Sequence, residues 1–296
     1  MGQAGRHREG LRVFETVLVA DRGLLAVRVI RSCQRLGIKA VSCVTEGDEN
    51  ALHTRVADEI IRLGVADPRS TEAVVEAVIE AARVSGAQAI HPGGGPWAAD
   101  AAFAGAVLAT DLAWVGAPPG VPAEWHAAWR ETVRRGGCTL LWEASATEPS
   151  DVTAAGSRRL VGPDRLVEAV TRTDLVERQL RQAAGERPHD VPTGSGYAMQ
   201  AALYAGPQTL VPVVVRGWAA PDGAGIVVDT VLADGARLTR YDDAVLARVT
   251  AHGADRRQAL ARLTATVDGI VLAEPPAELA ELRALLREPS VISMVG

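Results

Sequence analysis

Lysine is nearly absent from this chain of 296 residues. Lysine and arginine together number 31, and Lys39 is the only lysine. Proteins that bind nucleotides usually keep lysines at the phosphates, because the compact ammonium group and the planar guanidinium group do not substitute freely for each other. The composition therefore argues against a phosphate site built on lysine, and it favours surface charge as the role of most arginines.

Long apolar runs and a basic excess are also missing. No apolar run reaches the roughly 18 residues that a membrane span needs. The net charge is −5, so no basic excess is available to neutralise the phosphates of a nucleic acid. Residues 1–15 are predicted to be a flexible tail and not a signal peptide, because no apolar segment follows their basic side chains. We expect no membrane and no nucleic acid among the partners.

Cysteines and histidines show no metal-type spacing, so no metal site is predicted. The chain has three cysteines, which are Cys33, Cys43 and Cys138. A small, odd number of cysteines without a secretion signal indicates a reducing, cytoplasmic location. Cys33 lies on an apolar helical stripe and Cys43 in an apolar run, so both are expected in the core.

Strands and helices alternate over residues 16–116. Short apolar runs predict strands, and apolar residues at helical spacing predict helices. The predicted strands cover 16–20, 40–44, 88–91 and 112–115, and the predicted helices cover 24–36, 71–85 and 100–109. This alternation is typical of a doubly wound parallel sheet.

The second half of the chain has the pattern of an antiparallel sheet with closing helices. From residue 197 on, β-branched runs at 211–218, 225–232 and 237–241 are separated by Asp-Gly pairs, which are hairpin signals. Closing helices are predicted at 256–267 and 276–287. Between the halves we predict a helix at 125–135, a strand at 138–142, a loop at 143–158 and one long helix at 165–185.

Two groups of short sequence motifs resemble those of the biotin carboxylase family. The first group begins with Val17-Leu-Val-Ala-Asp-Arg-Gly23 and ends with Ala89-Ile-His-Pro-Gly-Gly-Gly95, as in the N-terminal domain of that family. The second group includes residues 173–186, which resemble the helix that follows the family's catalytic segment, and Tyr241-Asp-Asp243 and Asp268-Gly-Ile270, which resemble its C-terminal domain. The resemblance implies an α/β fold with a Rossmann-like (pre-ATP-grasp) parallel-sheet domain and an α+β domain with an antiparallel sheet.

The resemblance divides the chain into four segments. Residues 1–15 are the tail, 16–116 the N-terminal-like domain, and 166–296 the C-terminal-like domain. Only 117–165 are left for the ATP-grasp module that the family places between them, so this stretch is expected to be a remnant or linker.

The same resemblance implies that catalysis is lost. The ATP-grasp module needs a glycine-rich loop, lysines and magnesium-binding glutamates for phosphoryl transfer. In an ungapped register, Ala155 stands at a metal glutamate and Pro163 at the glutamate that acts as a base, while Arg159 is the only possible catalytic remnant. Alanine and proline neither hold magnesium nor take a proton. Val227 also stands where the family has an arginine that stabilises the enolate of biotin. We therefore expect no use of ATP, magnesium or biotin.

The glycine loop after the strand at 88–91 is the candidate ligand site. Its amide groups could cradle an anion at the edge of an open α/β sheet, or the loop could be a tight βα connection that needs positive φ. In the family this loop lines the biotin pocket, and here Gly94 replaces its tyrosine. The ligand-binding candidates are His91, Gly93, Gly94, Gly95 and Arg22.

Two functions remain open from the sequence. The first is a non-catalytic biotin-carboxylase-like protein that acts as a structural or regulatory partner of an acyl-CoA carboxylase system. It would be a homodimer or a heteromer with a carboxylase subunit, with Arg28 and Arg31 each paired with acidic residues across the dimer axis. The alternative is an enzyme or small-anion binder of secondary metabolism that reuses the interdomain cleft, with Arg158, Arg159 or His91 holding the anion.

Overall fold

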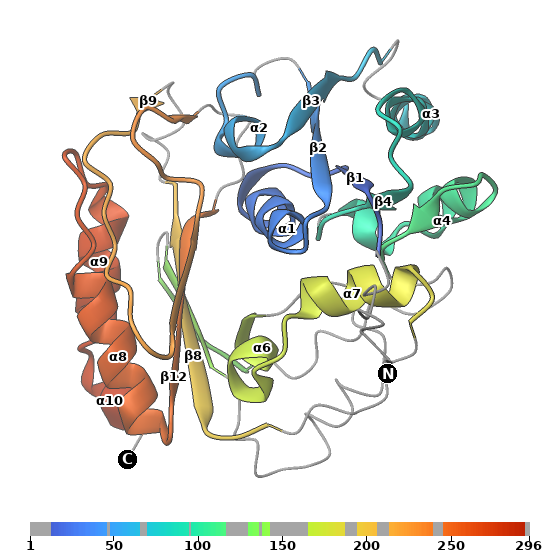
Figure 1. The fold of residues 1–296 in the computed structure, drawn as a ribbon. Helices are drawn as coiled ribbons and strands as arrows, with labels where there is room; N and C mark the ends of the chain where they lie inside the picture. Colours follow the sequence, from blue (N-terminus) through green and yellow to red (C-terminus); the bar gives the residue numbers. More distant parts are fainter. Residues whose placement is uncertain are drawn as a thin grey trace, which may run out of the picture.

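Two five-stranded sheets organise the protein in the computed structural model (Figure 1). The structure describes residues 13–45, 48–65, 70–94, 96–116, 130–135, 138–142, 165–186, 194–205, 213–238 and 245–293. The first sheet is built from the N-terminal part of the chain and the second from the remainder. Within these ranges, no helix is both long enough and apolar enough to cross a membrane.

The first sheet is parallel throughout, with the strand order β3-β2-β1-β4-β5. Its strands are β1 (Thr16–Val19), β2 (Lys39–Val44), β3 (Glu59–Arg62), β4 (Ala89–His91) and β5 (Ala113–Trp114). The predicted parallel sheet is confirmed. The strand β3 was not predicted, because as an edge strand with alternating exposure it is not an apolar run.

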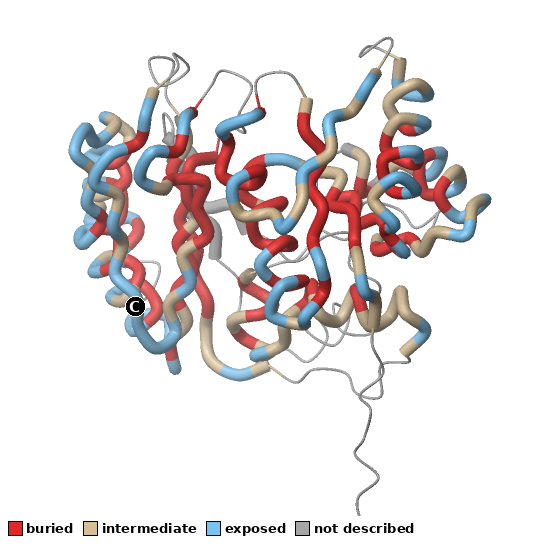
Figure 2. The backbone as a smooth tube through the Cα atoms, turned by 45° about the horizontal axis from the view of Figure 1, so that its top comes forward, coloured by how far each residue is buried: buried red, intermediate tan, exposed pale blue. Residues whose placement is uncertain are grey.

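Helices cover both faces of this sheet. Alternate residues of a strand face opposite sides. Leu18 of β1 accordingly packs with α3 (Thr71–Val84) and α4 (Ala101–Leu108), whereas Val17 and Val19 pack with α1 (Gly23–Arg35) and α7 (Leu175–Ala183). The short helices α2 (Leu52–Val56) and η1 (Pro96–Ala99) lie in the connections. Figure 2 shows the inner strands of this sheet as largely buried, while its edge strand β3 is partly exposed.

The second sheet is antiparallel, with the strand order β10-β12-β8-β7-β6. Its strands are β6 (Arg130–Arg135), β7 (Cys138–Trp142), β8 (Tyr197–Tyr204), β10 (Ile226–Thr230) and β12 (Val245–Gly253). The predicted antiparallel sheet is confirmed, as is the strand at 138–142. Because β6 and β7 come from residues 117–165, the stretch between the two predicted domains contributes directly to this sheet.

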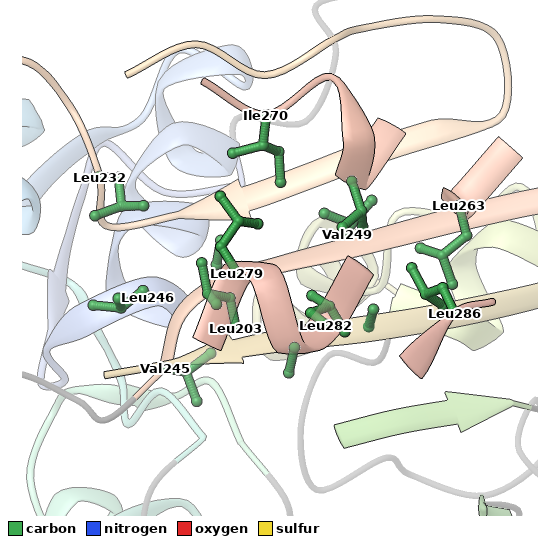
Figure 3. Packing of buried hydrophobic residues seen from close by; sticks show 14 of the residues in the cluster. Leu203, Leu232, Val245, Leu246, Val249, Leu263, Ile270, Leu279, Leu282 and Leu286 are labelled. Atoms are coloured by element: carbon green, nitrogen blue, oxygen red, sulfur yellow. The ribbon is translucent and has the colours of Figure 1, made fainter. Parts of the chain in front are cut away.

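Closing helices pack on the outer face of the second sheet. They are α8 (Arg256–Asp268), α9 (Ala277–Leu285) and α10 (Pro289–Ser293), and α8 and α9 match the prediction. Figure 3 shows Leu263, Leu279 and Leu282 of these helices against Leu203 and Val249 of the strands. The inner face contacts α1 and α6 (Arg165–Thr171), so α1 lies between the two sheets.

Three sequence predictions were wrong. The long helix at 165–185 is two helices, α6 and α7, because the chain turns at Arg172 with φ +54° and restarts with Asp174 as the N-cap. The predicted helix at 125–135 is wrong over Arg130–Arg135, because this segment forms the strand β6. Residues 125–129 lie outside the described residues. The expected hairpins do not form: β10 pairs with β12, while β9 (Val213–Val214) pairs with β11 (Arg237–Leu238).

Candidate functional site

The carboxyl ends of β1, β2 and β4 meet at one edge of the parallel sheet. Open α/β sheets bind ligands at this edge, where the strand order reverses. The order β3-β2-β1-β4-β5 reverses between β1 and β4. The segment after β1 supplies Asp21 and Arg22, β2 is followed by Thr45, and β4 runs into the glycine loop. The predicted candidates Arg22, His91, Gly93 and Gly94 are thus placed along one edge, while Gly95 lies outside the described residues.

His91 holds the glycine loop in place through a hydrogen bond from the Gly93 N–H. Its ring is fully buried, and its Nδ1 accepts a hydrogen bond of 2.9 Å from the Gly93 N–H. Burial lowers the pKa of His91 to about 4, although the nearby Gln179 of α7 acts in the opposite direction, and nearby Arg28 lowers it further. A neutral imidazole that accepts at Nδ1 carries its proton at Nε2. His91 therefore holds the loop in place as a buried, neutral ring.

Asp21 fills the concave side of the glycine loop. Its Oδ2 accepts a hydrogen bond of 3.1 Å from the Gly94 N–H, and its Oδ1 accepts one of 2.9 Å from the Arg22 N–H. Gly93 has φ +75°, and a Cβ atom there would lie 1.9 Å from Asp21 Oδ2. The carboxylate thus occupies the place where an external anion would meet the Gly94 amide, so the loop does not fit an anionic ligand.

We expect Gly93→Ala to lower the free energy of unfolding more than Gly37→Ala does. Both glycines have positive φ, which costs a residue with a Cβ about 1–2 kcal/mol. A Cβ at Gly37 meets nothing within 4 Å, whereas one at Gly93 collides with Asp21. Urea denaturation of both variants separates the two effects. Equal losses would show that Asp21 does not fill the loop in solution.

A second polar cluster lies beside Asp21, at the ends of β1 and β2. Arg22 Nη2 is 3.3 Å from Thr45 Oγ1 and 3.7 Å from Asp48 Oδ2. The Thr45 hydroxyl donates a hydrogen bond of 2.5 Å to the same Asp48 oxygen. His53 is buried close by. Burial lowers the pKa of His53 to about 4 against the effect of Asp48, and Arg22 lowers it further. Arg22, a predicted ligand-binding candidate, therefore faces a carboxylate of its own chain.

Asp48 and His53 were missed by sequence reasoning, because they show neither metal spacing nor a glycine-rich context. The signal that was available is topological. Thr45 follows β2 and Asp21 follows β1, and β1 and β2 are neighbouring parallel strands. Polar residues just after such strands converge at the same sheet edge.

A small pocket opens between this cluster and the helices α3 and α4. Its volume is about 120 Å³. Its polar lining comes from Asp21, Arg22, Thr45 and Asp48, and its apolar lining includes Val75 and Phe103. Small-molecule sites usually measure about 300–1,000 Å³, so this pocket does not fit a nucleotide.

A buried ion cluster lies between the two sheets. We define this interdomain ion cluster as Arg28 of α1, Arg165 and Glu168 of α6, and Asp229 of β10. Glu168 accepts hydrogen bonds from Arg28, from Arg165 at 2.8 Å and from the Leu175 N–H at 2.7 Å. Arg165 also binds Asp229 through two hydrogen bonds of 2.7 and 2.6 Å.

The two central side chains of the interdomain ion cluster are almost completely buried. Side-chain exposure is 4% for Arg28 and 7% for Glu168. Burial raises the pKa of Glu168, while Arg28 and Arg165 act in the opposite direction. Burial shifts the pKa of Arg28 in the other direction, downward, and Glu168 opposes this shift.

The expectation that Arg28 pairs across a dimer axis is wrong for this residue. Arg28 bonds to Glu168 of its own chain, because α1 is covered on a second face by the other sheet. Arg31, on the same helix, is exposed. Leu24, one turn before Arg28 on α1, is part of the second sheet's core.

The other predicted residues are scattered. Arg158 and Arg159 lie outside the described residues. Val227 lies in β10 opposite Thr250 and is 36% exposed. Cys33 and Cys43 are buried free thiols, as predicted, and burial raises the pKa of each to about 12. In the part of the chain that the structure describes, no group of three or more His, Cys, Asp or Glu residues is arranged to hold a metal ion.

Comparison with known proteins identifies both parts of the chain. The family model for the biotin carboxylase N-terminal domain matches residues 13–121, and that for the biotin carboxylase C-terminal domain matches residues 212–294. Residues 122–211 lie between the two matched ranges.

Curated relatives match over about a third of the chain. The mitochondrial methylcrotonoyl-CoA carboxylase subunit alpha of Oryza sativa is 45% identical over 105 residues, which are 36% of this chain and 14% of the relative. The biotin carboxylase of Halalkalibacterium halodurans is 38% identical over 109 residues, 37% of this chain and 24% of the relative. The matched part thus spans less than a quarter of either relative.

Solved structures show the same fold. The biotin carboxylase domain of the Hydrogenobacter thermophilus 2-oxoglutarate carboxylase has a TM-score of 0.76 at 18% identity, covering 93% of this chain and 94% of that chain. The Kluyveromyces lactis urea carboxylase has a TM-score of 0.76 at 22% identity, covering 96% of this chain and 32% of that chain. Because both domain models match in the predicted order and the fold agrees, the chain belongs to the biotin carboxylase family through its N-terminal and C-terminal domains.

Proposed function

We propose that this protein is a non-catalytic member of the biotin carboxylase family that serves as a structural or regulatory partner in an acyl-CoA carboxylase system. The observation that carries this proposal is the glycine loop closed by Asp21, since the Gly94 amide is already bound to a carboxylate of the chain itself. Relatives of the matched region include subunits of methylcrotonoyl-CoA and propionyl-CoA carboxylases, which supports the choice of system.

Two further observations support a scaffold role. The single lysine of the chain, Lys39, forms an ion pair with Glu59 on the neighbouring strand β3, away from the carboxyl edge of the sheet. The interdomain ion cluster fixes α1 and α6 to the second sheet, as a rigid scaffold requires. The free thiols of Cys33 and Cys43 are compatible with the cytoplasmic location, which stays a prediction.

The first test is catalytic. Purified protein with ATP, magnesium, bicarbonate and free biotin is expected to release no phosphate above background, and calorimetry is expected to give an ATP dissociation constant no tighter than about 1 mM, or about −4 kcal/mol. The Pseudomonas aeruginosa biotin carboxylase, which is 39% identical to this chain over 104 residues, is the positive control. Bicarbonate-dependent phosphate release by this protein would overturn the proposal.

The second test is association. In the family, surfaces on the N- and C-terminal domains form the dimer contact, and the Hydrogenobacter thermophilus domain is described as a dimer. Symmetric two-fold contacts are the commonest form of self-association. Light scattering is therefore expected to give about twice the 31.0 kDa chain mass.

A matched pair of charge reversals locates this contact. Arg31→Glu on α1 is expected to shift the protein to monomer, whereas Arg83→Glu on α3 is expected to leave the mass unchanged. Both arginines are exposed in the single chain. A wild-type monomer that also fails to bind an acyl-CoA carboxylase subunit would refute the scaffold role.

The alternative, an enzyme or anion binder that reuses the interdomain cleft, has less support. The arginines and acids described between the two sheets are paired with one another and largely buried. His91, its proposed anion ligand, is enclosed beneath the glycine loop. Anion binding by the cleft would be detected as protection of the protein against thermal unfolding by bicarbonate or acetate.

A further inference from the structure

The pocket at the carboxyl edge of the parallel sheet is continuous with the hydrophobic core on one face of that sheet. Every apolar residue that lines the pocket either belongs to the core cluster that α3 and α4 form with the sheet or packs against it. Some of these residues are buried and others only partly buried, so the pocket extends from the core toward the surface. The buried ones are Cys43, Val75, Val78 and Phe103, and the partly buried ones are Ala20, Leu63, Val74 and Trp97.

Aromatic contacts hold the wall of the pocket on the side of α4. The ring of Phe103 makes an edge contact with Trp97 at a centroid distance of 5.7 Å and another with Trp114 at 5.0 Å. Held between two rings, Phe103 is not free to turn into the pocket. Protein cores are close-packed and have few voids larger than a water molecule. The pocket is therefore space beside the core that the described side chains leave unfilled.

The polar side chains of the pocket are engaged with the chain itself. Thr45 donates its hydroxyl to Asp48, Arg22 lies 3.3 Å from Thr45 Oγ1, and Asp21 accepts a hydrogen bond from the Gly94 N–H. An ammonium ligand would meet the guanidinium of Arg22, and a carboxylate ligand would meet Asp21 and Asp48. Because a ligand of either charge faces a like charge, the lining favours a neutral ligand.

The volume limits the size of the ligand. The pocket measures about 120 Å³. An apolar cavity of about 150 Å³ in another protein binds benzene, so this pocket is smaller than a six-carbon ring requires and has room for about four carbons. Burial of an apolar group is favourable in proportion to the area that leaves water, so such a ligand needs no polar contact to bind.

We propose that this pocket is a binding site for a neutral, compact aliphatic group of about four carbons, the size of an isobutyl group. The group lies against Val75, Val78 and Phe103, and a hydroxyl that it carries lies on the side of the pocket lined by Arg22 and Thr45. The site is formed within the N-terminal sheet and its helices, and it does not depend on the proposed role in a carboxylase system.

An NMR titration of the full chain, with labelled valine methyl groups and at neutral pH, tests this assignment. Isobutanol is expected to shift the methyl signals of Val75 and Val78 with a dissociation constant of about 1–10 mM. Isobutylamine and isobutyrate keep the carbon skeleton but carry a charge, whereas benzyl alcohol keeps the hydroxyl but carries a ring. Each of these three probes is expected to bind at least about tenfold more weakly than isobutanol.

Three variants of α3 locate the binding. Val74→Phe fills the pocket and is expected to weaken isobutanol binding at least about tenfold. The matched control is Val84→Phe, the same substitution at a position of the same helix that is 70% exposed, and it is expected to leave binding unchanged. Val78→Ala enlarges the pocket and is expected to strengthen the binding of benzyl alcohol at least about tenfold. This gain keeps the test decisive if Val74→Phe fails to fold.

Three results would overturn the proposal. Equal affinity for isobutanol and isobutylamine would show that the site does not select a neutral ligand. Affinities that neither Val74→Phe nor Val78→Ala changes would show that the ligand binds elsewhere. The absence of any methyl shift at about 50 mM isobutanol would show that the pocket stays empty.

Discussion

Replacing Glu168 by alanine is expected to lower the free energy of unfolding by about 3–5 kcal/mol. Glu168 accepts hydrogen bonds from two arginines and one backbone amide, and it lies in the interior between the sheets. Its loss leaves the buried Arg28 without its carboxylate, and uncompensated buried charge is far more costly than a lost surface pair. Guanidinium denaturation followed by circular dichroism measures the change.

The matched control is Glu177→Ala on the next helix. Glu177 also pairs with an arginine, Arg181 at 2.8 Å, but these side chains are 37% and 39% exposed. Exposed pairs contribute at most about 1 kcal/mol. If the two variants lose similar stability, the interdomain ion cluster does not hold the two sheets together.

Acidification is expected to destabilise the protein through two histidines. In the unfolded chain a histidine takes up a proton near pH 6.5, whereas His53 and His91 resist protonation in the fold until about pH 4. Between these values the unfolded state binds more protons, so stability falls as the pH falls. Each histidine is expected to contribute a loss of about 2 kcal/mol between about pH 7 and pH 5.

The variants His53→Gln and His91→Gln isolate this effect. Each is expected to remove its own share of the pH dependence of the unfolding free energy, and the double variant to remove both shares. Carboxylates affect all four proteins equally, so the difference from wild type reports the histidines alone. A double variant whose pH dependence equals that of wild type would show that these rings are protonated as easily in the fold as in the unfolded chain.

The N-terminal sheet was predictable because its inner strands are largely buried. Val17 to Val19 form a short apolar run with no exposed side chain, and such runs indicate strands inside a parallel sheet. The edge strand at Glu59–Arg62 carries charges at both ends and gives no such signal. Strand β12 was missed for another reason: its register is set by pairing with β8, about fifty residues earlier in the chain.

The candidate site was only partly predictable. The glycine loop and Arg22 stand out in the sequence through the family resemblance, and the structure places them at one sheet edge. The sequence did not indicate that Asp21 would fill the loop, since that depends on a contact between β1 and β4 across 73 positions. The same holds for Arg28: its helical position is evident from sequence, but its partner Glu168 lies 140 positions away.

During synthesis on the ribosome, α1 is made long before the second sheet that it packs against. The helix packs Val29 and Cys33 against the first sheet, while Leu24 belongs to the core of the second. The second sheet is complete only once β12 has been made, about 200 residues after α1. At roughly 5–20 residues per second, Leu24 waits about 10–40 seconds for the second sheet, and Arg28 waits about 7–28 seconds for Glu168, which lies 140 positions away. During that interval the nascent chain presents an apolar and cationic surface to which chaperones have access.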